Sequence, residues 1–156
     1  MLKRKGIFRL VLATVVFAAA CDPGITFQPN GWKQVSSNKW SHSFGDIEVE
    51  TESFGGTSFM PFVNTAVTIK NHSAEKVFVT KAVLKVHDQE YESKPLPTVG
   101  VDPGDSGKYG LWFDLPDRKT IHDCLNSDIA DIALNVKSGE SEWTLIIPYK
   151  RNLFAL

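Results

Sequence analysis

Cys21 has the sequence surroundings that most clearly suggest a chemical fate. Four Lys or Arg side chains lie among the first nine residues, and a mostly apolar run from Leu10 to Ala20 follows them. Small residues stand directly before the cysteine. This order is that of a secretory signal peptide. The apolar run is eleven residues long, about half of what a bilayer-spanning helix needs, so we expect residues 1–20 to be removed during export.

The segment Ala18-Ala19-Ala20-Cys21 resembles the lipobox of bacterial lipoproteins, with Ala18 at the position where that family most often has Leu. The resemblance implies that the Cys21 thiol receives a diacylglyceryl group and that the new amino group takes an acyl chain such as palmitate. Two or three acyl chains suffice for stable anchoring. Asp22 resembles the retention signal of enteric lipoproteins, which implies the periplasmic face of the inner membrane, with the outer membrane as the alternative.

A second interpretation of the same cleavage site stays open. Ala18-x-Ala20 also suits ordinary signal peptidase, which would release a soluble protein with a free Cys21 thiol. That thiol can pair with Cys124 in an oxidising compartment. If Cys21 is lipidated, Cys124 has no intramolecular partner, and we expect it to be a buried structural thiol.

Two other short motifs contain residue types used by hydrolases. Gly104-Asp105-Ser106-Gly107 resembles the nucleophile motif of chymotrypsin-like proteases, but Pro103 and the glycines predict a turn. His122-Asp123-Cys124 places a base beside a thiol in sequence, and immediate neighbours seldom point the same way. We therefore expect no catalysis, and a small envelope hydrolase using Ser106 or Cys124 is the weakest alternative.

Histidines and tryptophans suggest two further kinds of site. His72, His87 and Asp88 would form a metal site only if neighbouring strands brought them together, and the prediction is that they are solvated turn residues without a metal or cofactor. The tryptophans suggest a glycan-binding alternative through exposed rings, although packing in the core is the expected role. They are Trp32, Trp40, Trp112 and Trp143.

The charge of the exported part argues against a nucleic-acid partner. The chain has 17 basic and 18 acidic residues, and the first twenty residues hold four of the basic ones and no acid. The remainder therefore carries a net charge of −5. An acidic body of this kind is not attracted to nucleic acid or, as a whole, to anionic lipid.

Strands are the elements that must position these residues, because apolar and polar residues alternate through most of the chain. About seven strands in roughly 120 residues predict an all-β, antiparallel sandwich of immunoglobulin or fibronectin type. The turns and alternation of Val63–Leu115 resemble immunoglobulin-like domains of bacterial envelope lipoproteins. A short helix is expected near Asp117–Asn126, with Asp117 as its N-cap. Pro148 interrupts the last strand and predicts a sheet edge there.

The domain organisation and the function follow from these patterns. We expect a signal peptide over residues 1–20, a lipidated N-terminus and flexible tether over residues 21–31, and the sandwich over residues 32–156. The tether prediction rests on two prolines and two glycines within ten residues. The expected function is a non-catalytic lipoprotein, anchored through Cys21, that binds another envelope protein or helps a complex assemble.

Overall fold

A computed structural model describes residues 25–56 and 62–152 of the chain. Every strand pair in these residues is antiparallel, so the predicted all-β, antiparallel architecture is confirmed. The described part has eleven strands where about seven were predicted. The elements are β1 (Ile25–Pro29), β2 (Lys33–Ser36), β3 (Lys39–Phe44), β4 (Ile47–Glu52), β5 (Phe54–Gly56), β6 (Phe62–Asn71), β7 (Val77–Val86), β8 (Gln89–Glu92), β9 (Ser106–Asp114), α1 (Arg118–Leu125), β10 (Ile129–Ser138) and β11 (Ser141–Asn152).

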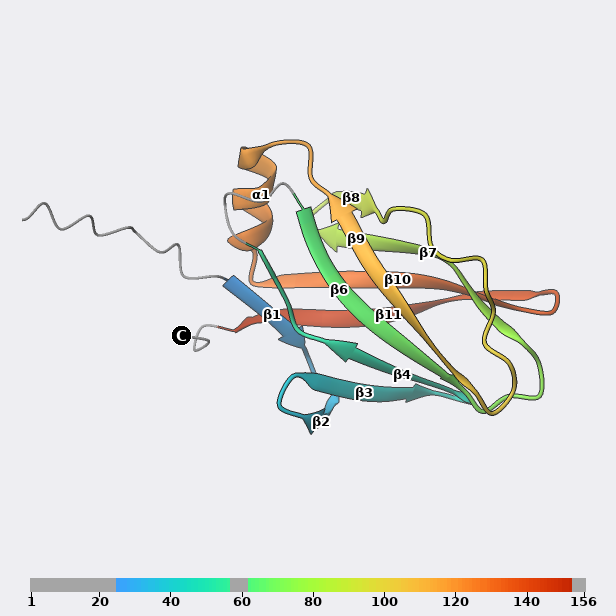
Figure 1. Ribbon diagram of the computed structural model, residues 1–156. Coiled ribbons are helices and arrows are strands. Elements are labelled where there is room, and N and C mark those ends of the chain that lie inside the picture. Colours follow the sequence, from blue (N-terminus) through green and yellow to red (C-terminus); the bar gives the residue numbers. More distant parts are fainter. Residues whose placement is uncertain (1–24, 57–61, 153–156) are drawn as a thin grey trace, which may run out of the picture.

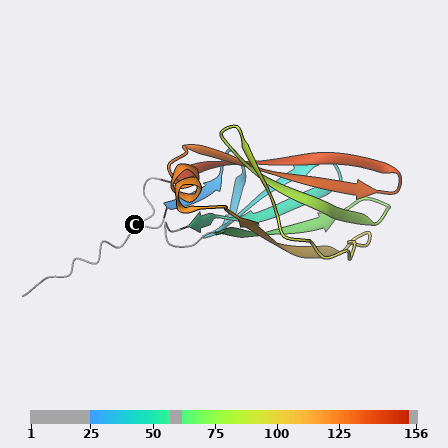
Figure 2. The same cartoon turned by 90° about the horizontal axis from the view of Figure 1, so that it is seen from above.

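The strands form two layers packed face to face, as Figure 2 shows from above. One layer has the order β2-β3-β4-β6-β9, and the other has the order β5-β1-β11-β10-β7-β8. The short strand β5 pairs with β1 and touches β6, which joins the layers along one side. An isolated bridge between Ser93 and Phe113 joins them along the other side. The two layers therefore form a β-sandwich in which short backbone pairings link the layers along both sides.

The core lies between the layers, because alternate residues of the long strands point inward. The burial pattern of β4, for example, alternates along all six of its residues. One polar contact crosses this core, since the hydroxyl oxygens of Tyr149 and Thr51 are 2.7 Å apart. Burial raises the pKa of the Tyr149 hydroxyl. The largest fully buried side chains are Tyr149, Phe27, Phe113, Ile69, Leu84, Leu111, Ile132, Leu134 and Ile147.

The sandwich has two ends that matter for function (Figure 1). At the end we call proximal, β1 begins, β11 finishes and α1 lies close by. At the end we call distal, the hairpin between β10 and β11 turns, and β6 and β7 are connected. The loop Asp102–Asp105 that leads into β9 also lies there, because Ser106 is in register with Lys70 near the end of β6.

The boundary between tether and domain differs from the sequence-based prediction. Ile25–Pro29 was assigned to the tether, yet it forms β1, a central strand between β5 and β11. Phe27 is buried and stacks on Phe54 with ring centroids 5.0 Å apart. Pro29 is the last residue of the strand, so its missing N–H does not interrupt the ladder. The sandwich therefore begins at Ile25 instead of Trp32.

The predicted short helix is confirmed as α1. Asp117 immediately precedes it, and a carboxylate oxygen of Asp117 accepts a hydrogen bond of 2.7 Å from the Thr120 backbone N–H. This is the expected N-cap geometry, which satisfies one of the free N–H groups in the first turn. These backbone hydrogen bonds hold the pKa of the Asp117 carboxyl below its ordinary value.

Candidate functional site

Cys21, the predicted lipidation site, lies outside the described residues, as do Asp22 and the whole predicted signal peptide. Within the described ranges, no helix combines the length and apolar character that a bilayer crossing requires. Residue Ile25, where the description begins, is fixed in β1 four positions after Cys21. The candidate sites below therefore belong to the domain that follows the cysteine.

The Gly-Asp-Ser-Gly motif forms the predicted turn. The Asp105 backbone N–H donates a hydrogen bond of 3.1 Å to the Asp102 carbonyl. Gly104 has a φ of 80°, a conformation that glycine adopts without the steric cost other residues pay. Pro103 occupies the preceding turn position, whose φ proline favours. Ser106 comes next, exposed, as the first residue of β9.

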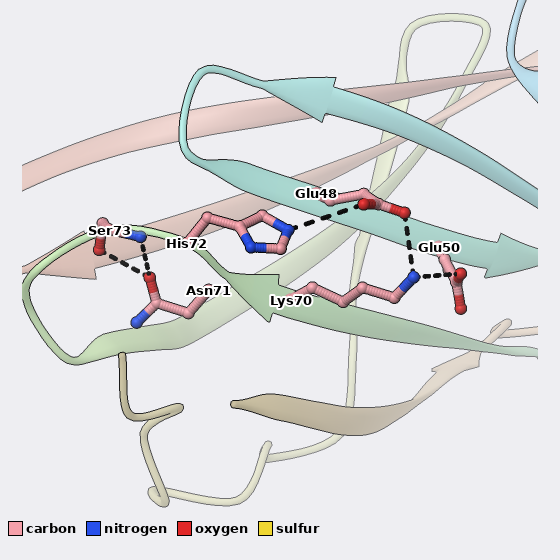
Figure 3. A network of polar contacts seen from close by, with 6 residues as sticks. All are labelled: Glu48, Glu50, Lys70, Asn71, His72 and Ser73. Atoms are coloured by element: carbon pink, nitrogen blue, oxygen red, sulfur yellow. Dashed lines mark hydrogen bonds and ion pairs between the residues drawn. The ribbon is translucent and has the colours of Figure 1, made fainter. Parts of the chain in front are cut away.

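A charged network lies on the outer face of β4 and β6, near Ser106 (Figure 3). Lys70 Nζ is 2.6 Å from a Glu50 oxygen and 3.0 Å from a Glu48 oxygen. His72 Nε2 is 3.7 Å from the other Glu48 oxygen. Hydrogen bonding to Lys70 lowers the pKa of Glu48, and hydrogen bonding to Glu50 raises the pKa of Lys70. The network therefore favours the charged forms of Glu48 and Lys70.

The network does not complete a catalytic set with Ser106. Ser106 is in register with Lys70, and His72 lies two residues further along the chain. A general base must approach the nucleophile to about 2.6–3.2 Å between heavy atoms, and the His72 imidazole is instead directed at Glu48, with Nε2 3.7 Å from a Glu48 oxygen. Within residues 25–56 and 62–152, no hydrogen bond joins Ser106 to a histidine. The arrangement is a set of ion pairs on the outer face of β4 and β6, and no contact in it activates Ser106 as a nucleophile.

Asn71 is the residue that organises this end of the domain, and the sequence analysis gave it no role. Its side chain is buried, and its Nδ2 donates to the carbonyls of Glu75 at 2.7 Å and Val101 at 2.9 Å. Its Oδ1 accepts from the backbone N–H and the hydroxyl of Ser73. Its backbone also exchanges hydrogen bonds with Gly104 and Asp105. The Asn71 amide thus holds two distal loops together.

Cys124 lies in α1 beside a pocket of about 480 Å³ at the proximal end. The thiol is buried, and burial, with a smaller contribution from Asp123, raises its pKa from 9.0 to about 11. A protonated thiol is a weak nucleophile. The pocket also brings together His87, Asp88, Tyr91 and Asp123, which the sequence did not place side by side. This environment opposes nucleophilic catalysis by Cys124.

The residues of the possible metal site are separated by the length of the sandwich. His72 follows β6 at the distal end, whereas His87 and Asp88 form the turn between β7 and β8 at the proximal end. The ten residues of β7 separate them by roughly 30 Å at about 3.3 Å per residue. Among the described residues, no three His, Cys, Asp or Glu side chains are placed to hold a metal ion.

The four tryptophans are engaged in packing within the domain. Trp40 is buried, and Trp32 and Trp143 pack against the core. Trp112 lies on the outer face of β9, where Phe62 stacks on it at 4.0 Å between ring centroids. Lys94 Nζ lies 4.7 Å from the Trp112 centroid as well. The Trp112 ring therefore already has two partners, which leaves little of it for stacking on a sugar.

An apolar groove of about 540 Å³ opens near the distal end, between β7 and the segment Lys94–Gly100, which we call the strap. Leu96 and Pro97 of the strap form one wall, and Phe78, Lys137 and Gly139 line the other side. The strap contains two prolines, which lack the N–H that strand pairing requires. It rejoins β7 only at Val101, which exchanges two backbone hydrogen bonds with Val77.

The strap that borders the groove is fixed at its outer end. Thr98, an exposed residue of the strap, lines the groove, whereas the neighbouring Val99, which is 74% exposed, lines a separate pocket on the side of β9. At Gly100 the strap touches β7 so closely that a Cβ atom would lie 2.7 Å from the Phe78 ring. The Tyr109 hydroxyl donates to the Val99 carbonyl at 3.0 Å. These contacts fix the outer end of the strap between β7 and β9.

Comparisons with known proteins concern the fold. No protein-family model and no curated protein sequence matches the chain. A functionally unknown protein from Listeria monocytogenes EGD-e is similar in structure, with a TM-score of 0.52 and 12% identity over 80% of this chain and 87% of that chain. At this identity the similarity shows a shared fold alone.

Two further solved structures are more distant. The GAE domain of yeast GGA1 has a TM-score of 0.40 and 9% identity over 70% of this chain and 95% of that domain. A FixG-related protein from Vibrio parahaemolyticus has a TM-score of 0.39 and 16% identity over 69% of this chain and 95% of that chain. Similarities of this size carry no functional inference.

Proposed function

We propose that the chain is a non-catalytic bacterial lipoprotein, anchored at the periplasmic face of a membrane through lipid on Cys21. Its sandwich, of immunoglobulin or fibronectin type, binds another envelope protein. The support for the anchor is the order of basic, apolar and small residues before Cys21. The buried, protonated Cys124 thiol and the isolated Ser106 support a binding role over hydrolysis.

One observation supports the binding role, namely that the start of β1 and the apolar groove lie at opposite ends of the domain. The chain that leads back to Cys21 leaves β1 at the proximal end, and the groove opens near the distal end. A partner that approaches from the periplasm can therefore reach the groove without meeting the bilayer. The occupant that fits is a protein segment with an apolar side chain for the space between Phe78 and Leu96. Lys137 at the groove favours an acidic neighbour on that segment.

The anchor is tested by metabolic labelling with palmitate. We expect label in the wild-type protein and none in Cys21→Ser, because the thiol and the amino group of Cys21 are the acylation sites in the proposal. Fractionation should place the wild type with membranes. If the wild type carries no label and is cleaved before Cys21, the protein is exported in soluble form and the anchor is refuted.

The groove is tested by crosslinking in cells, with the same charge placed at two exposed positions. Thr98→Glu places the charge in the groove, where the exposed Thr98 is part of the lining, and Val35→Glu places it on β2, where Val35 is 45% exposed. We expect Thr98→Glu to lose a specific crosslinked partner that the wild type and Val35→Glu retain. Equal loss or equal retention in both variants would remove the groove from the proposed function.

A further inference from the structure

The short connection between Cys21 and the domain restricts how an anchored domain can be oriented. β1 begins at Ile25, and four residues span at most about 14 Å. β11 and β5 pair with β1 on its two sides, so its first residues belong to the sandwich. A lipid on Cys21 therefore keeps the proximal end next to the headgroups. This step rests on the proposed anchor.

The proximal end presents an exposed isoleucine beside two basic residues. Ile129, the first residue of β10, is 66% exposed. It is in register with Lys150 of β11, which is in register with Gln28 of β1. Arg151 follows Lys150, and its backbone N–H donates to the Asp128 carbonyl at 2.9 Å. We call Ile129, Lys150 and Arg151 the proximal edge.

The conformation of the proximal edge is fixed by the fold. Ser127 is buried, and its hydroxyl donates to the Ile129 carbonyl and accepts from the Ile129 N–H. Both backbone groups of the exposed isoleucine are thus engaged by one side chain. Among the residues that the structure describes, little covers the Ile129 side chain, which is 66% exposed.

We propose that the anchored domain rests on the lipid surface through the proximal edge. Ile129 would enter the boundary between headgroups and acyl chains, and Lys150 and Arg151 would contact anionic headgroups. The opposite end supports this orientation, because acidic residues dominate its loops and an anionic surface repels them. Those residues are Asp46, Glu75, Asp102, Asp105 and Glu140, with Lys76 paired to Asp102.

Acidic residues near the proximal edge limit which side of that end can face the lipid. Asp128 precedes Ile129, Asp117 precedes α1, and Asp123 is exposed on α1. Because Arg118 and Lys119 balance the carboxylates of Asp117 and Asp123, α1 adds no net attraction to an anionic surface, and the β10–β11 side with Lys150 and Arg151 turns toward it. In this orientation the groove, eight residues further along β10 at Lys137, stands roughly 25 Å from the lipid.

The orientation is tested by NMR of the isotope-labelled mature protein in nanodiscs of phosphatidylethanolamine and phosphatidylglycerol. Headgroups that carry a nitroxide broaden nearby amide signals. We expect broadening of residues 128–130 and 150–151 to be several-fold stronger than that of residues 138–140, and also stronger than that of residues 119–124 of α1 at the same end. The short connection to Cys21 alone predicts the first difference, so the second difference tests the contact of the proximal edge.

Ile129→Glu should abolish the second difference, whereas Ile146→Glu, at a 42% exposed position in the middle of β11, should leave it unchanged. Broadening of residues 119–124 that equals or exceeds that of residues 128–130 overturns the proposal, as does stronger broadening at residues 138–140.

A second arm separates this inference from the proposed anchor. Mass spectrometry of the purified protein first establishes whether Cys21 carries lipid. If it does not, the free Cys21 thiol is coupled to maleimide lipid in the same nanodiscs, where the buried Cys124 does not compete. The anchor would then have failed, and the broadening pattern of the coupled protein would still decide the orientation.

Discussion

The two ends of the sandwich satisfy their polar groups in different ways. At the distal end, the buried amide of Asn71 hydrogen-bonds to the loops on both sides of it. At the proximal end, the eight-residue helix α1 is capped by the exposed carboxylate of Asp117 and borders an open pocket. The distal loops are therefore held by the interior of the protein, whereas α1 depends on contacts near solvent. Loops held from the interior favour tight binding in a nearby groove, because a preorganised surface loses less conformational entropy when a partner binds.

The largest effect expected from this comparison is that of Asn71→Leu. The substitution keeps the approximate volume but removes the bonds that Nδ2 donates to the carbonyls of Glu75 and Val101 and those that Oδ1 accepts from Ser73. A hydrogen bond contributes about 0.5–1.5 kcal/mol, so we expect the free energy of unfolding to fall by about 3 kcal/mol. Urea denaturation followed by Trp fluorescence measures it.

Ser73→Ala provides the control for Asn71, because it removes only the hydroxyl that donates to Oδ1, keeps the backbone N–H bond and lies nearer to solvent. We expect a loss of about 1 kcal/mol. If Asn71→Leu costs no more than Ser73→Ala, the distal loops are held by their backbone bonds alone, and the contrast between the ends disappears.

The second effect concerns Cys124 at the proximal end and depends on pH. The folded thiol has a pKa of about 11, above its ordinary 9.0. The stability contributed by the buried neutral thiol is thus complete below pH 9 and is lost as pH rises through 11. We expect the advantage of the wild type over Cys124→Ala to shrink by about 1–2 kcal/mol across that window. Both proteins contain the same tyrosines, so the difference isolates the thiol.

Two outcomes would contradict this account of Cys124. The first is a stability difference that stays constant between pH 9 and 11. The second is rapid reaction of native Cys124 with a thiol reagent at neutral pH, which would show an accessible thiolate. Either result would return Cys124 to the candidate nucleophiles and weaken the proposed non-catalytic role.

The sequence predicted the long strands well because their alternation reports a buried and a wet face directly. In β4 (Ile47–Glu52), apolar or small residues alternate with glutamates in the sequence, buried residues alternate with half-buried ones in the structure, and Asp117 caps the predicted helix. The short strands β1, β2 and β5 contain too few residues for a periodicity to appear. Nearby prolines also argued against a strand at β1. A proline weakens a strand only where its missing N–H would have paired with a neighbouring strand.

Pro148 illustrates that dependence. The sequence predicted a sheet edge at Pro148, but β11 is a central strand between β1 and β10. The Pro148 carbonyl accepts a hydrogen bond from Asn30, the residue that follows β1. Because N–H and C=O of one strand residue face the same neighbour, the missing N–H faces the place where β1 has already ended. The groove and the amide of Asn71 could not be predicted, since they depend on loops that meet only in the fold.

A smaller effect is expected from Lys70→Met on the outer face of β6. The variant loses the ion pairs with Glu48 and Glu50 and leaves two carboxylates close together. Partly exposed pairs contribute about 0.2–1 kcal/mol, and we expect a loss in that range that shrinks with added salt. Lys81→Met, which removes one exposed pair with Glu92, should cost less. A loss from Lys70→Met that does not respond to salt would show that the lysine acts through packing.

The smallest effect on the whole domain is expected from Asp117→Ala, and it should stay within α1. The lowered pKa of Asp117 means that the carboxylate supports the helix above its ordinary pKa and that this support is lost as pH falls. In Asp117→Ala we expect the α1 amides to exchange faster with deuterium at neutral pH, while the loops around Asn71 keep their protection. Asp117→Asn should keep the helix, because asparagine also caps well, and should remove its pH dependence. If Asp117→Ala also speeds exchange at Asn71, the two ends unfold together and are not independent units of stability.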